Sequence, residues 1–338
     1  MGKASPTDRE SIPAEVVAAA RRRSEARAAR DWVTADRLRD DIEAAGWRVT
    51  DWGTEFRLER SSPPDVEVGG EIRYGRSDAV PSRLDDAPIG VASIVLIADA
   101  GDASAIEAVS AAARHAAGDI DLVVVGDGID DAAATGIRDR LASSPLPEPR
   151  RELVRTSAPL GRAAALNLGI RRARAPIVVL LDASVLPTGD VVSPLVASLD
   201  DPTVAVAGPI GLVSTDLRRF EELAAGAKAL DAAAIQGYLM AFRRSDATDR
   251  GPLDEAFRFY RNLDIWWSLV LRDEGEGHPP RRAVVVPGVP LTQRDPWART
   301  SMRPADRDRL SKRNFYRLLD RFRARSDLAV AGAAPTND

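Results

Sequence analysis

The sequence PIVVLLDAS at residues 176–184 is an apolar run that ends in a carboxylate. Continuous Val, Ile and Leu residues are typical of a parallel strand that is buried on both faces of a sheet. Ligands of open α/β sheets bind at the carboxyl ends of such strands, so Asp182 is expected to face a crevice. A surface turn after a core strand gives the same pattern, and the surrounding sequence has to separate the two interpretations.

Apolar runs alternate with alanine-rich stretches of helical spacing on both sides of this strand. The runs expected to form strands are VASIVLIA, IDLVVVG and ELVRT before it, and TVAVAG, GYLMAFRR and RAVVVPG after it. Helices are expected near residues 103–117, between the next strands, over 265–271, and as a basic amphipathic helix over 306–325. This β-α-β order predicts an α/β fold with a mostly parallel central sheet covered by helices.

Composition excludes several classes of site. The chain has 338 residues, 44% of them apolar and 29% charged, which is enough to bury a sizeable core. There is no Cys, so thiolate chemistry and disulfides are excluded, and only His115 and His278 offer an imidazole. A metal site would therefore depend mainly on carboxylates. The formal net charge of -4 excludes a globally basic nucleic-acid binder.

No apolar run approaches the roughly 20 residues of a membrane-spanning helix. The polar opening MGKASPTDRESIP lacks the apolar centre of a signal peptide, so no transmembrane segment and a cytoplasmic location are expected.

Four segments are expected along the chain. Residues 1–60 read as two helices and a hairpin, with Asp31 capping the second helix and Gly46 ending it. Residues 61–90 are rich in Pro, Gly and Asp and read as a linker. Residues 91–325 form the large α/β domain, and residues 326–338 are expected to be a disordered tail.

The large domain resembles a family 2 glycosyltransferase with the GT-A fold. The stretches that carry the resemblance are SIVLIADAGD, LVVVGDGIDD, PLGRAAALNLGIRRARAPIVVLLDAS, and GYLMAFRRSDA followed by GPLDEAFRFYRNLDIWWSLVLRDEG. The third is the most specific, because the family has a Gly and an Asn before a helix, a strand and an Asp-x-Asp motif. Gly161, Asn167, Asp182 and Ser184 stand at those places.

The resemblance implies a nucleotide-diphospho-sugar donor and a divalent cation, Mn or Mg, bound to carboxylate oxygens. Asp182 is the implied metal ligand, and Ser184 replaces the second acid of the family motif, which weakens the metal site. Asp127 resembles the acid that binds the nucleotide base, although Gly126 replaces the first acid there and a turn beside Gly128 explains Asp127 equally well.

The remaining binding positions follow from the same resemblance. Gly161 and Asn167 are expected to shape the donor loop, and Gly237 and Tyr238 to line the acceptor side.

An inverting transferase also needs a base opposite the diphosphate. Asp264 is the candidate, with Asp254 second. The usual Glu-Asp pair is not intact, and another alignment places Asn262 at the base position, which implies a slow or inactive enzyme. Asp264 also fits a first-turn acid that merely stabilises a helix.

Other residues of the large domain have two interpretations each. A His-containing segment that completes the metal shell in similar proteins reads LTQRDPWART here, so the nearest substitutes are Gln293, Arg294 and Asp295. Lys312, Arg313 and Arg317 suit either an anionic ligand or a solvated helix face. For Trp266 and Trp267, sugar stacking and core packing are the alternatives.

The N-terminal stretch ARDWVTADRLRDDIEAAG, with Asp51-Trp52-Gly53-Thr54 after it, resembles the C-terminal end of cysteinyl-tRNA synthetases. That resemblance implies an RNA contact through the arginine-rich first helix. The alternative is a docking or dimerising module whose arginines are solvated and paired with Glu25, Asp36 and Asp40. The basic residues concerned are Arg21, Arg22, Arg23, Arg27 and Arg30.

The resulting hypothesis is a hexosyltransferase-type glycosyltransferase. It would move a sugar from a nucleotide-diphospho-sugar to a hydroxyl acceptor on a glycan, lipid or protein, with inversion and with help from a divalent metal. The altered positions Gly126, Ser184 and Asn262-Leu263 keep a second hypothesis open, a catalytically decayed scaffold of the same fold. A third is an RNA-directed activity centred on the N-terminal module.

Overall fold

The computed structural model describes residues 12–52, 55–60, 62–102, 104–115, 119–223, 230–294 and 303–331. The chain divides into two compact units, residues 1–64 and 65–338. No helix within these described ranges is long and apolar enough to cross a membrane.

The N-terminal unit is a helical pair with a hairpin, as the sequence predicts. Its elements are α1 (Ala14–Ala28), α2 (Trp32–Ala44), β1 (Trp47–Trp52) and β2 (Glu55–Arg60). Asp31 caps α2, because its carboxylate accepts a hydrogen bond from the Thr34 N–H at 3.1 Å. The strands pair antiparallel, and Leu38, Ile42 and Trp47 belong to a small core of this unit.

One arginine of the basic first helix is buried in this unit. Arg23 is 6% exposed and its guanidinium binds both carboxylate oxygens of Asp51, at 2.7 and 3.2 Å. Arg27 also pairs with Asp51 and lies over the Trp32 ring. The predicted partners Glu25, Asp36 and Asp40 are therefore not those of Arg23, because the hairpin places Asp51 against α1.

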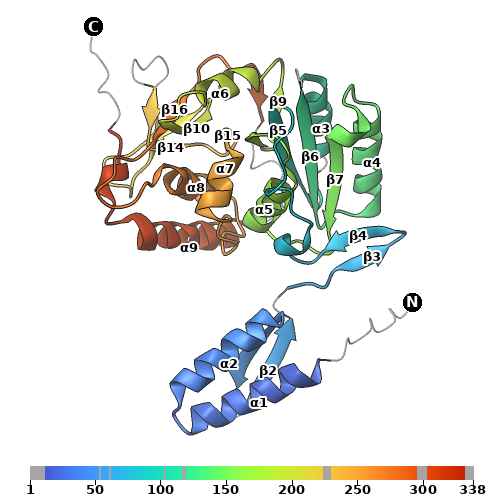
Figure 1. Cartoon of the computed structure of the whole chain (residues 1–338), viewed down its shortest axis with the longest axis vertical. Helices are drawn as coiled ribbons and strands as arrows, with labels where there is room; N and C mark the ends of the chain where they lie inside the picture. Colours follow the sequence, from blue (N-terminus) through green and yellow to red (C-terminus); the bar gives the residue numbers. More distant parts are fainter. Residues whose placement is uncertain are drawn as a thin grey trace. The chain divides into compact units, whose positions relative to one another are not determined.

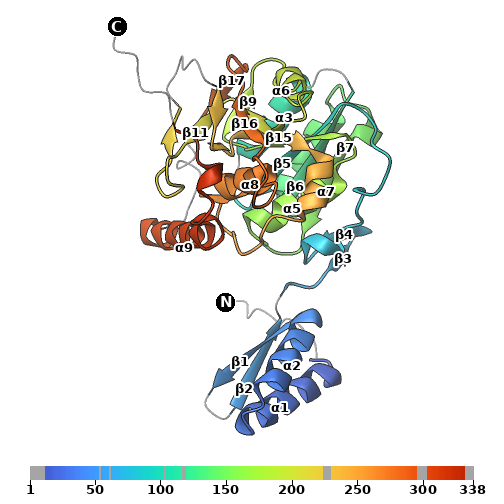
Figure 2. The ribbon, with the colours of Figure 1, turned by 60° about the vertical axis from the view of Figure 1, so that its left-hand side comes forward.

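The second unit contains a large mixed sheet with helices on both faces (Figures 1 and 2). Within the described residues ten strands form this sheet, in the order β13-β16-β10-β15-β8-β5-β6-β7-β4-β3. In chain order, their bounds are β3 (Val66–Val68), β4 (Glu71–Tyr74), β5 (Ala92–Asp99), β6 (Ile120–Asp127), β7 (Arg151–Thr156), β8 (Ile177–Leu181), β10 (Val204–Gly208), β13 (Asp231–Ala232), β15 (Leu239–Arg243) and β16 (Arg282–Val285).

The helices and the smaller strands complete this unit. The helices are α3 (Ser104–His115), α4 (Asp131–Ala142), α5 (Arg162–Arg172), α6 (Ser193–Ser198), α7 (Arg244–Arg250), α8 (Leu263–Arg272) and α9 (Pro304–Phe322). The smaller strands are β9 (Val185–Pro187), β11 (Gly211–Val213), β12 (Glu221–Glu222), β14 (Ala234–Ile235) and β17 (Leu291–Gln293).

The centre of the sheet is parallel, because β5 pairs parallel with both β6 and β8, and β6 with β7. Side chains of β5 alternate between two cores. Val95 and Ile97 pack with residues of α5, α8 and α9, whereas Ile94 and Leu96 pack with residues of α3, α4 and α6. Burial on both faces explains the continuous apolar runs and confirms the predicted α/β sheet.

The structure corrects the expected linker at residues 61–90. Part of this stretch forms the hairpin β3–β4 and joins the large sheet, where β4 runs parallel to β7. Gly69 and Gly70 both have positive φ, 62° and 81°, which suits the tight turn of a hairpin. The sequence VEVGGEIRY carried this signal, but the surrounding Pro and Asp residues obscured it.

The structure also corrects the expected disordered tail over residues 326–331; residues 332–338 lie outside the described ranges. Ser326–Leu328 form a short 3-10 helix, and Val330 makes an antiparallel bridge with Ser214. The cause is a buried cation: the Arg272 guanidinium donates to the carbonyls of Ala233 and Leu328, at 2.7 and 2.8 Å. Burial lowers the pKa of Arg272 to about 10.

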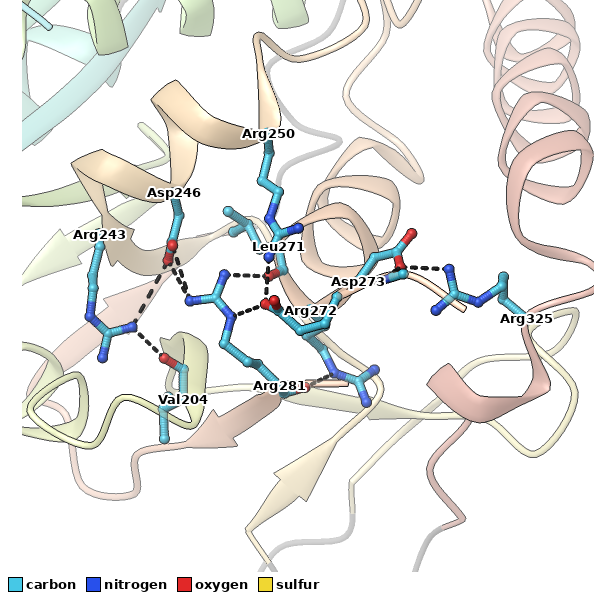
Figure 3. Close-up of polar contacts among 11 residues, drawn as sticks. Val204, Arg243, Asp246, Arg250, Leu271, Arg272, Asp273, Arg281 and Arg325 are labelled. Carbon is cyan, nitrogen blue, oxygen red and sulfur yellow. Dashed lines mark hydrogen bonds and ion pairs between the residues drawn. The ribbon is translucent and has the colours of Figure 1, made fainter. Parts of the chain in front are cut away.

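A polar network surrounds Arg272 (Figure 3). Arg281 binds the Asp246 carboxylate at 3.0 Å and donates to the Leu271 carbonyl at 2.8 Å, which links α7 to α8. Arg272 in turn donates to the Arg281 carbonyl at 2.9 Å. These contacts secure the helix α8 that carries Asp264.

Replacing Arg272 tests this network. We expect Arg272→Met to lower the free energy of unfolding by about 2–4 kcal/mol, because it leaves buried carbonyls without donors. Arg282→Ala is the control. That exposed arginine forms ion pairs with the partly exposed Asp201 and Asp231, so its loss should cost less than about 1 kcal/mol. Urea denaturation measures both, and equal losses would contradict the role given to Arg272.

Candidate functional site

A cavity of about 760 Å³ opens at the carboxyl ends of β5, β6 and β8. Its lining is strongly charged, and aromatic rings complete it. The charged residues are Asp99, Asp102, Asp127, Asp182, Asp264, Arg162, Arg218, Arg258 and Arg261. The aromatic ones are Phe220, Tyr238, Phe259, Tyr260, Trp267 and Phe315.

Strand register brings three carboxylates to one edge of the sheet. Asp99 and Asp127 are directly paired at the ends of β5 and β6. Asp182 follows the last residue of β8, which pairs with β5. Asp182 therefore lines a cavity, as the sequence predicts, and is not an isolated surface turn.

Arg162 and Ser184 hold the Asp182 carboxylate at this edge by hydrogen bonds. Its Oδ2 accepts a hydrogen bond from Arg162 Nη2 at 2.7 Å, and its Oδ1 accepts one from the Ser184 N–H at 2.8 Å. The Ser184 hydroxyl also donates to Oδ1. Ser184 is fully buried, so it orients Asp182.

Arg162 is a cation among these carboxylates. Its Nη1 lies 3.8 Å from Asp99 Oδ2, and its side chain is 12% exposed. Burial alone would lower the pKa of Arg162, but Asp182 and Asp99 raise it, with a further contribution from Asp127. Arg162 therefore stays charged and neutralises part of the acidic edge.

Asp99 is more easily protonated than an ordinary aspartate. The surrounding walls raise its pKa to about 6, and Asp127 and Asp182 add to the shift against the opposing effect of Arg162. Solvent reaches 54% of its side chain, which limits this effect. Arg162 thus relieves part of the like-charge crowding at the sheet edge, and Asp99 takes up a proton at a higher pH than an ordinary aspartate.

The donor set does not fit a divalent cation in the arrangement seen. Both Asp182 oxygens are hydrogen-bonded, one of them to a cation. Both Asp127 oxygens accept backbone N–H groups. Among the residues that the structure describes, no group of three or more His, Asp or Glu side chains is arranged to hold a metal. The predicted metal role of Asp182 stays a prediction.

Asp127 holds the loop before α5. Its carboxylate accepts hydrogen bonds from the N–H groups of Leu160 and Gly161, at 2.7 and 3.0 Å, and from the Thr156 hydroxyl at 3.0 Å. Burial outweighs these bonds and raises the pKa of Asp127. It lines the cavity, so a nucleotide contact stays a prediction beside this positioning role.

Gly161 and Asn167 position the loop that carries Arg258. Gly161 has φ 97°, and a Cβ there would lie 3.0 Å from Arg258 Cα. Asn167 is 3% exposed and exchanges hydrogen bonds of 2.8 Å with both the N–H and the carbonyl of Leu253. Gly161 lines the cavity, whereas Asn167 is not among its lining residues and acts through the loop.

Asp264 is hydrogen-bonded to the segment Gly237-Tyr238. Its Oδ2 accepts a hydrogen bond from the Gly237 N–H at 2.8 Å, and a Cβ on Gly237 would lie 3.0 Å from Asp264 Cβ. Burial raises the pKa of Asp264 in spite of hydrogen bonds from Gly237 and Ile265. Asp264 and Gly237 both line the cavity.

Asp254 is placed differently. It is not among the lining residues; its carboxylate pairs with Arg317 of α9 and accepts the Ala256 N–H at 3.0 Å. Those contacts brace the loop against α9. Lys312, Arg313 and Arg317 are exposed and are also not among the lining residues.

The described residues of the segment LTQRDPWART, where similar proteins have a His, make other contacts. Gln293 belongs to β17, and Arg294 pairs with Glu107 at 2.5 Å. Asp295 lies outside the described residues. Trp266 and Trp267 are both buried, at 4% and 1% exposure, so both belong to the core; Trp267 also reaches the cavity wall.

Sequence reasoning missed Asp99, Arg162 and Arg258. For Asp99 the signal was present, because it ends a strand-like run as Asp182 does. Arg162 also had a signal, since a cation at the first position of a helix opposes the helix dipole. No sequence pattern indicated Arg258, because its loop comes to lie beside Gly161 only in the folded protein.

A comparison with known protein families gives a match within the large domain. Residues 101–249 match the family model Glycosyl transferase family 2. Over these residues the chain is similar to family 2 glycosyltransferases. The family 2 match includes Asp127, Gly161, Asp182 and Gly237, and confirms the expected enzyme class, glycosyltransferase. It ends before Asp264.

Solved structures of low sequence identity resemble the chain. They include the mannosyltransferase PcManGT from Pyrobaculum calidifontis with GDP-Man and Mn²⁺, at 19% identity and TM-score 0.48, covering 76% of this chain and 79% of that one. GalNAc-T7 with UDP, GalNAc and Mn²⁺ matches at 14% identity and TM-score 0.50, covering 70% of this chain and 48% of that one. S. aureus TarS matches at 12% identity and TM-score 0.43, covering 68% and 44%.

These similarities concern the fold alone. The fold of the large domain is the mixed α/β fold of the GT-A type. A search of curated proteins gave no match. Nothing in the comparisons supports the resemblance of the N-terminal unit to cysteinyl-tRNA synthetases, which stays a prediction together with its RNA contact and the cytoplasmic location.

The contact of Gly161 with Arg258 can be tested by adding one methyl group. We expect Gly161→Ala to destabilise the protein by at least about 1 kcal/mol more than Gly288→Ala. Both glycines have positive φ, but only Gly161 has neighbours within 4 Å of the added Cβ. Thermal unfolding compares the two variants, and equal shifts would show that the close approach to Arg258 is unimportant.

Proposed function

We propose that this chain transfers a sugar from a nucleotide-diphospho-sugar to a hydroxyl acceptor with inversion at the anomeric carbon. The family 2 match over residues 101–249 supports the class of donor. The cavity supports the binding of such a donor, since it has charged and aromatic walls and is large enough for a small-molecule ligand. The acceptor, a glycan, lipid or protein, is left open.

One observation carries the proposal: the dipeptide Gly237-Tyr238 is hydrogen-bonded both to the backbone of Asp182 and to the carboxylate of Asp264. The Tyr238 carbonyl accepts the Asp182 N–H at 2.9 Å, and the Gly237 N–H donates to the Asp264 carboxylate at 2.8 Å. Asp182 and Asp264 also both raise the pKa of Tyr238, after the effect of its burial. Asp182 and Asp264 are therefore joined through one short segment and line the same cavity.

This arrangement suits an in-line displacement. The acceptor oxygen bonds to the anomeric carbon while the bond from that carbon to the diphosphate oxygen breaks. The nucleoside diphosphate leaves with the electron pair, and Asp264 takes the proton of the acceptor hydroxyl. Burial favours this role, because a raised pKa makes Asp264 a better proton acceptor than an ordinary aspartate.

Negative charge on the departing diphosphate has to be neutralised by a positive charge near Asp182. The family resemblance of the sequence predicts that a divalent cation bound to Asp182 carries this positive charge. In the structure, the guanidinium of Arg162 is hydrogen-bonded to Asp182 and can carry it instead.

Removing the carboxylate of Asp264 tests its role. We expect Asp264→Asn to lower kcat about 10²- to 10⁴-fold, the usual contribution of a general base. Affinity for UDP or GDP should change less than about threefold, because the nucleotide leaves from the other side of the sugar.

The comparison variant is Asp254→Asn, and donor turnover is the readout for both. If Asp254→Asn abolishes turnover and Asp264→Asn does not, the assignment is wrong. A wild-type protein that binds nucleotide without any turnover would favour the decayed scaffold.

The pH dependence of turnover gives a second test. Asp264 acts as a base only when ionised, and its pKa lies above the ordinary 3.8 in the folded protein. We therefore expect kcat to rise with pH through that raised pKa and to fall as the medium becomes acidic. Nucleotide affinity measured at each pH separates this effect from titration of Asp99. A kcat that stays constant down to pH 4 would contradict a base with a raised pKa.

A further inference from the structure

Arg162 breaks a local rule of helix structure. It is the first residue of α5, and no acidic residue stands in the first turn. The N-terminal end of a helix carries partial positive charge, so a buried cation is unfavourable there. Residues that break a local preference are concentrated at functional sites.

Two carboxylates offset this cost and fix the side chain. Arg162 Nη2 lies 2.7 Å from Asp182 Oδ2, and Nη1 lies 3.8 Å from Asp99 Oδ2. A guanidinium has five N–H donors in one plane, so these contacts leave donors for a ligand. Arg162 lines the cavity, and such a planar fork matches a phosphate group.

Arg258 supplies a second cation to the lining of the same cavity. Its carbonyl accepts the Arg162 N–H at 3.0 Å, so the two residues are adjacent in the backbone arrangement. Arg258 is exposed, lines the cavity and forms no ion pair with any residue in the described ranges. An arginine of this kind in a charged cavity is suited to an anion.

The helix N-terminus itself is not available to that anion. The loop carbonyls of Arg258 and Phe257 already accept the N–H groups of Arg162 and Ala163. Positive charge for an anion in this half of the cavity therefore comes from side chains.

We propose that Arg162, assisted by Arg258, binds the diphosphate of the donor and takes the charge-neutralising role for which the sequence predicts a divalent cation. The inference rests on the proposed function and narrows it to a metal-independent donor site. Asp182 and Asp99 then act as positioning residues, since they hold the Arg162 guanidinium. The buried Ser184 hydroxyl fixes Asp182 for that purpose.

Calorimetric titration with UDP, GDP, UMP and GMP tests the proposal. The wild-type protein is titrated once in EDTA and once in MnCl₂, which requires no variant to fold. We expect the nucleoside diphosphate that binds to do so with the same affinity, within about threefold, in both solutions.

Two variants and a control locate the effect. Arg162→Gln should weaken the diphosphate by about 10- to 100-fold, the range for hydrogen bonds to charged groups. The corresponding monophosphate should weaken by less than about threefold. Arg162→Lys keeps the charge without the planar fork and should be intermediate. Arg140→Gln, an exposed arginine of α4 outside the cavity lining, should bind as the wild type does.

The outcomes separate this inference from the proposed function. Diphosphate binding that requires manganese would overturn the role of Arg162 and leave the glycosyltransferase in place. Unchanged diphosphate affinity in Arg162→Gln would overturn the same role. If neither UDP nor GDP binds in either solution, ADP, CDP and TDP are titrated in the same way. If none of the five binds, the proposed function fails, and this inference fails with it.

Discussion

The ion pair between Arg162 and Asp182 is the interaction on which the charged half of the cavity depends. Parallel strands deliver Asp99, Asp127 and Asp182 to one edge of the sheet, where like charges repel one another. Helix α5 delivers a guanidinium among them. Without that cation the acidic edge would have to protonate further or bind another cation. Burial is the main cause of the raised pKa of Asp99, and the neighbouring carboxylates of Asp127 and Asp182 add to it.

The backbone around Arg162 connects the sheet to the loop that carries Arg258. Asp127 holds the N–H groups of Leu160 and Gly161, and the Arg162 N–H is held by the Arg258 carbonyl. Asn167 fixes the far part of that loop through Leu253. Asp127 and Asn167 therefore stabilise the loops of the site, whether or not they also contact a ligand. Together with the Arg258 carbonyl, these hydrogen bonds fix the position of Arg162.

The acceptor half depends on a second connection, the dipeptide Gly237-Tyr238. Its backbone binds the Asp182 N–H on one side and the Asp264 carboxylate on the other. The proposed reaction places the base at Asp264 and the diphosphate at Arg162, and both residues line the cavity. A displacement reaction needs both, because the proton leaves toward Asp264 while negative charge develops on the diphosphate.

Much of the architecture follows from the sequence, since burial on both faces makes β5, β6 and β8 recognisable as continuous apolar runs. The Asp at the end of β8 likewise indicates the cavity edge. The hairpin β3–β4 was hidden, because a Gly-Gly turn within a Pro- and Asp-rich stretch also fits a linker. The partners of Asp182 were not predictable either. Periodicity gives the face on which a residue lies, but the Arg162 and Arg258 contacts arise from loop packing between distant segments.

The most direct measurement is a crystal structure of the protein with its nucleoside diphosphate in manganese-containing solution, with anomalous diffraction collected at the manganese edge. The arrangement described predicts phosphate oxygens within hydrogen-bonding distance of Arg162 and no anomalous peak at Asp182. A manganese ion bridging Asp182 and the diphosphate, with the Arg162 side chain displaced, would contradict it.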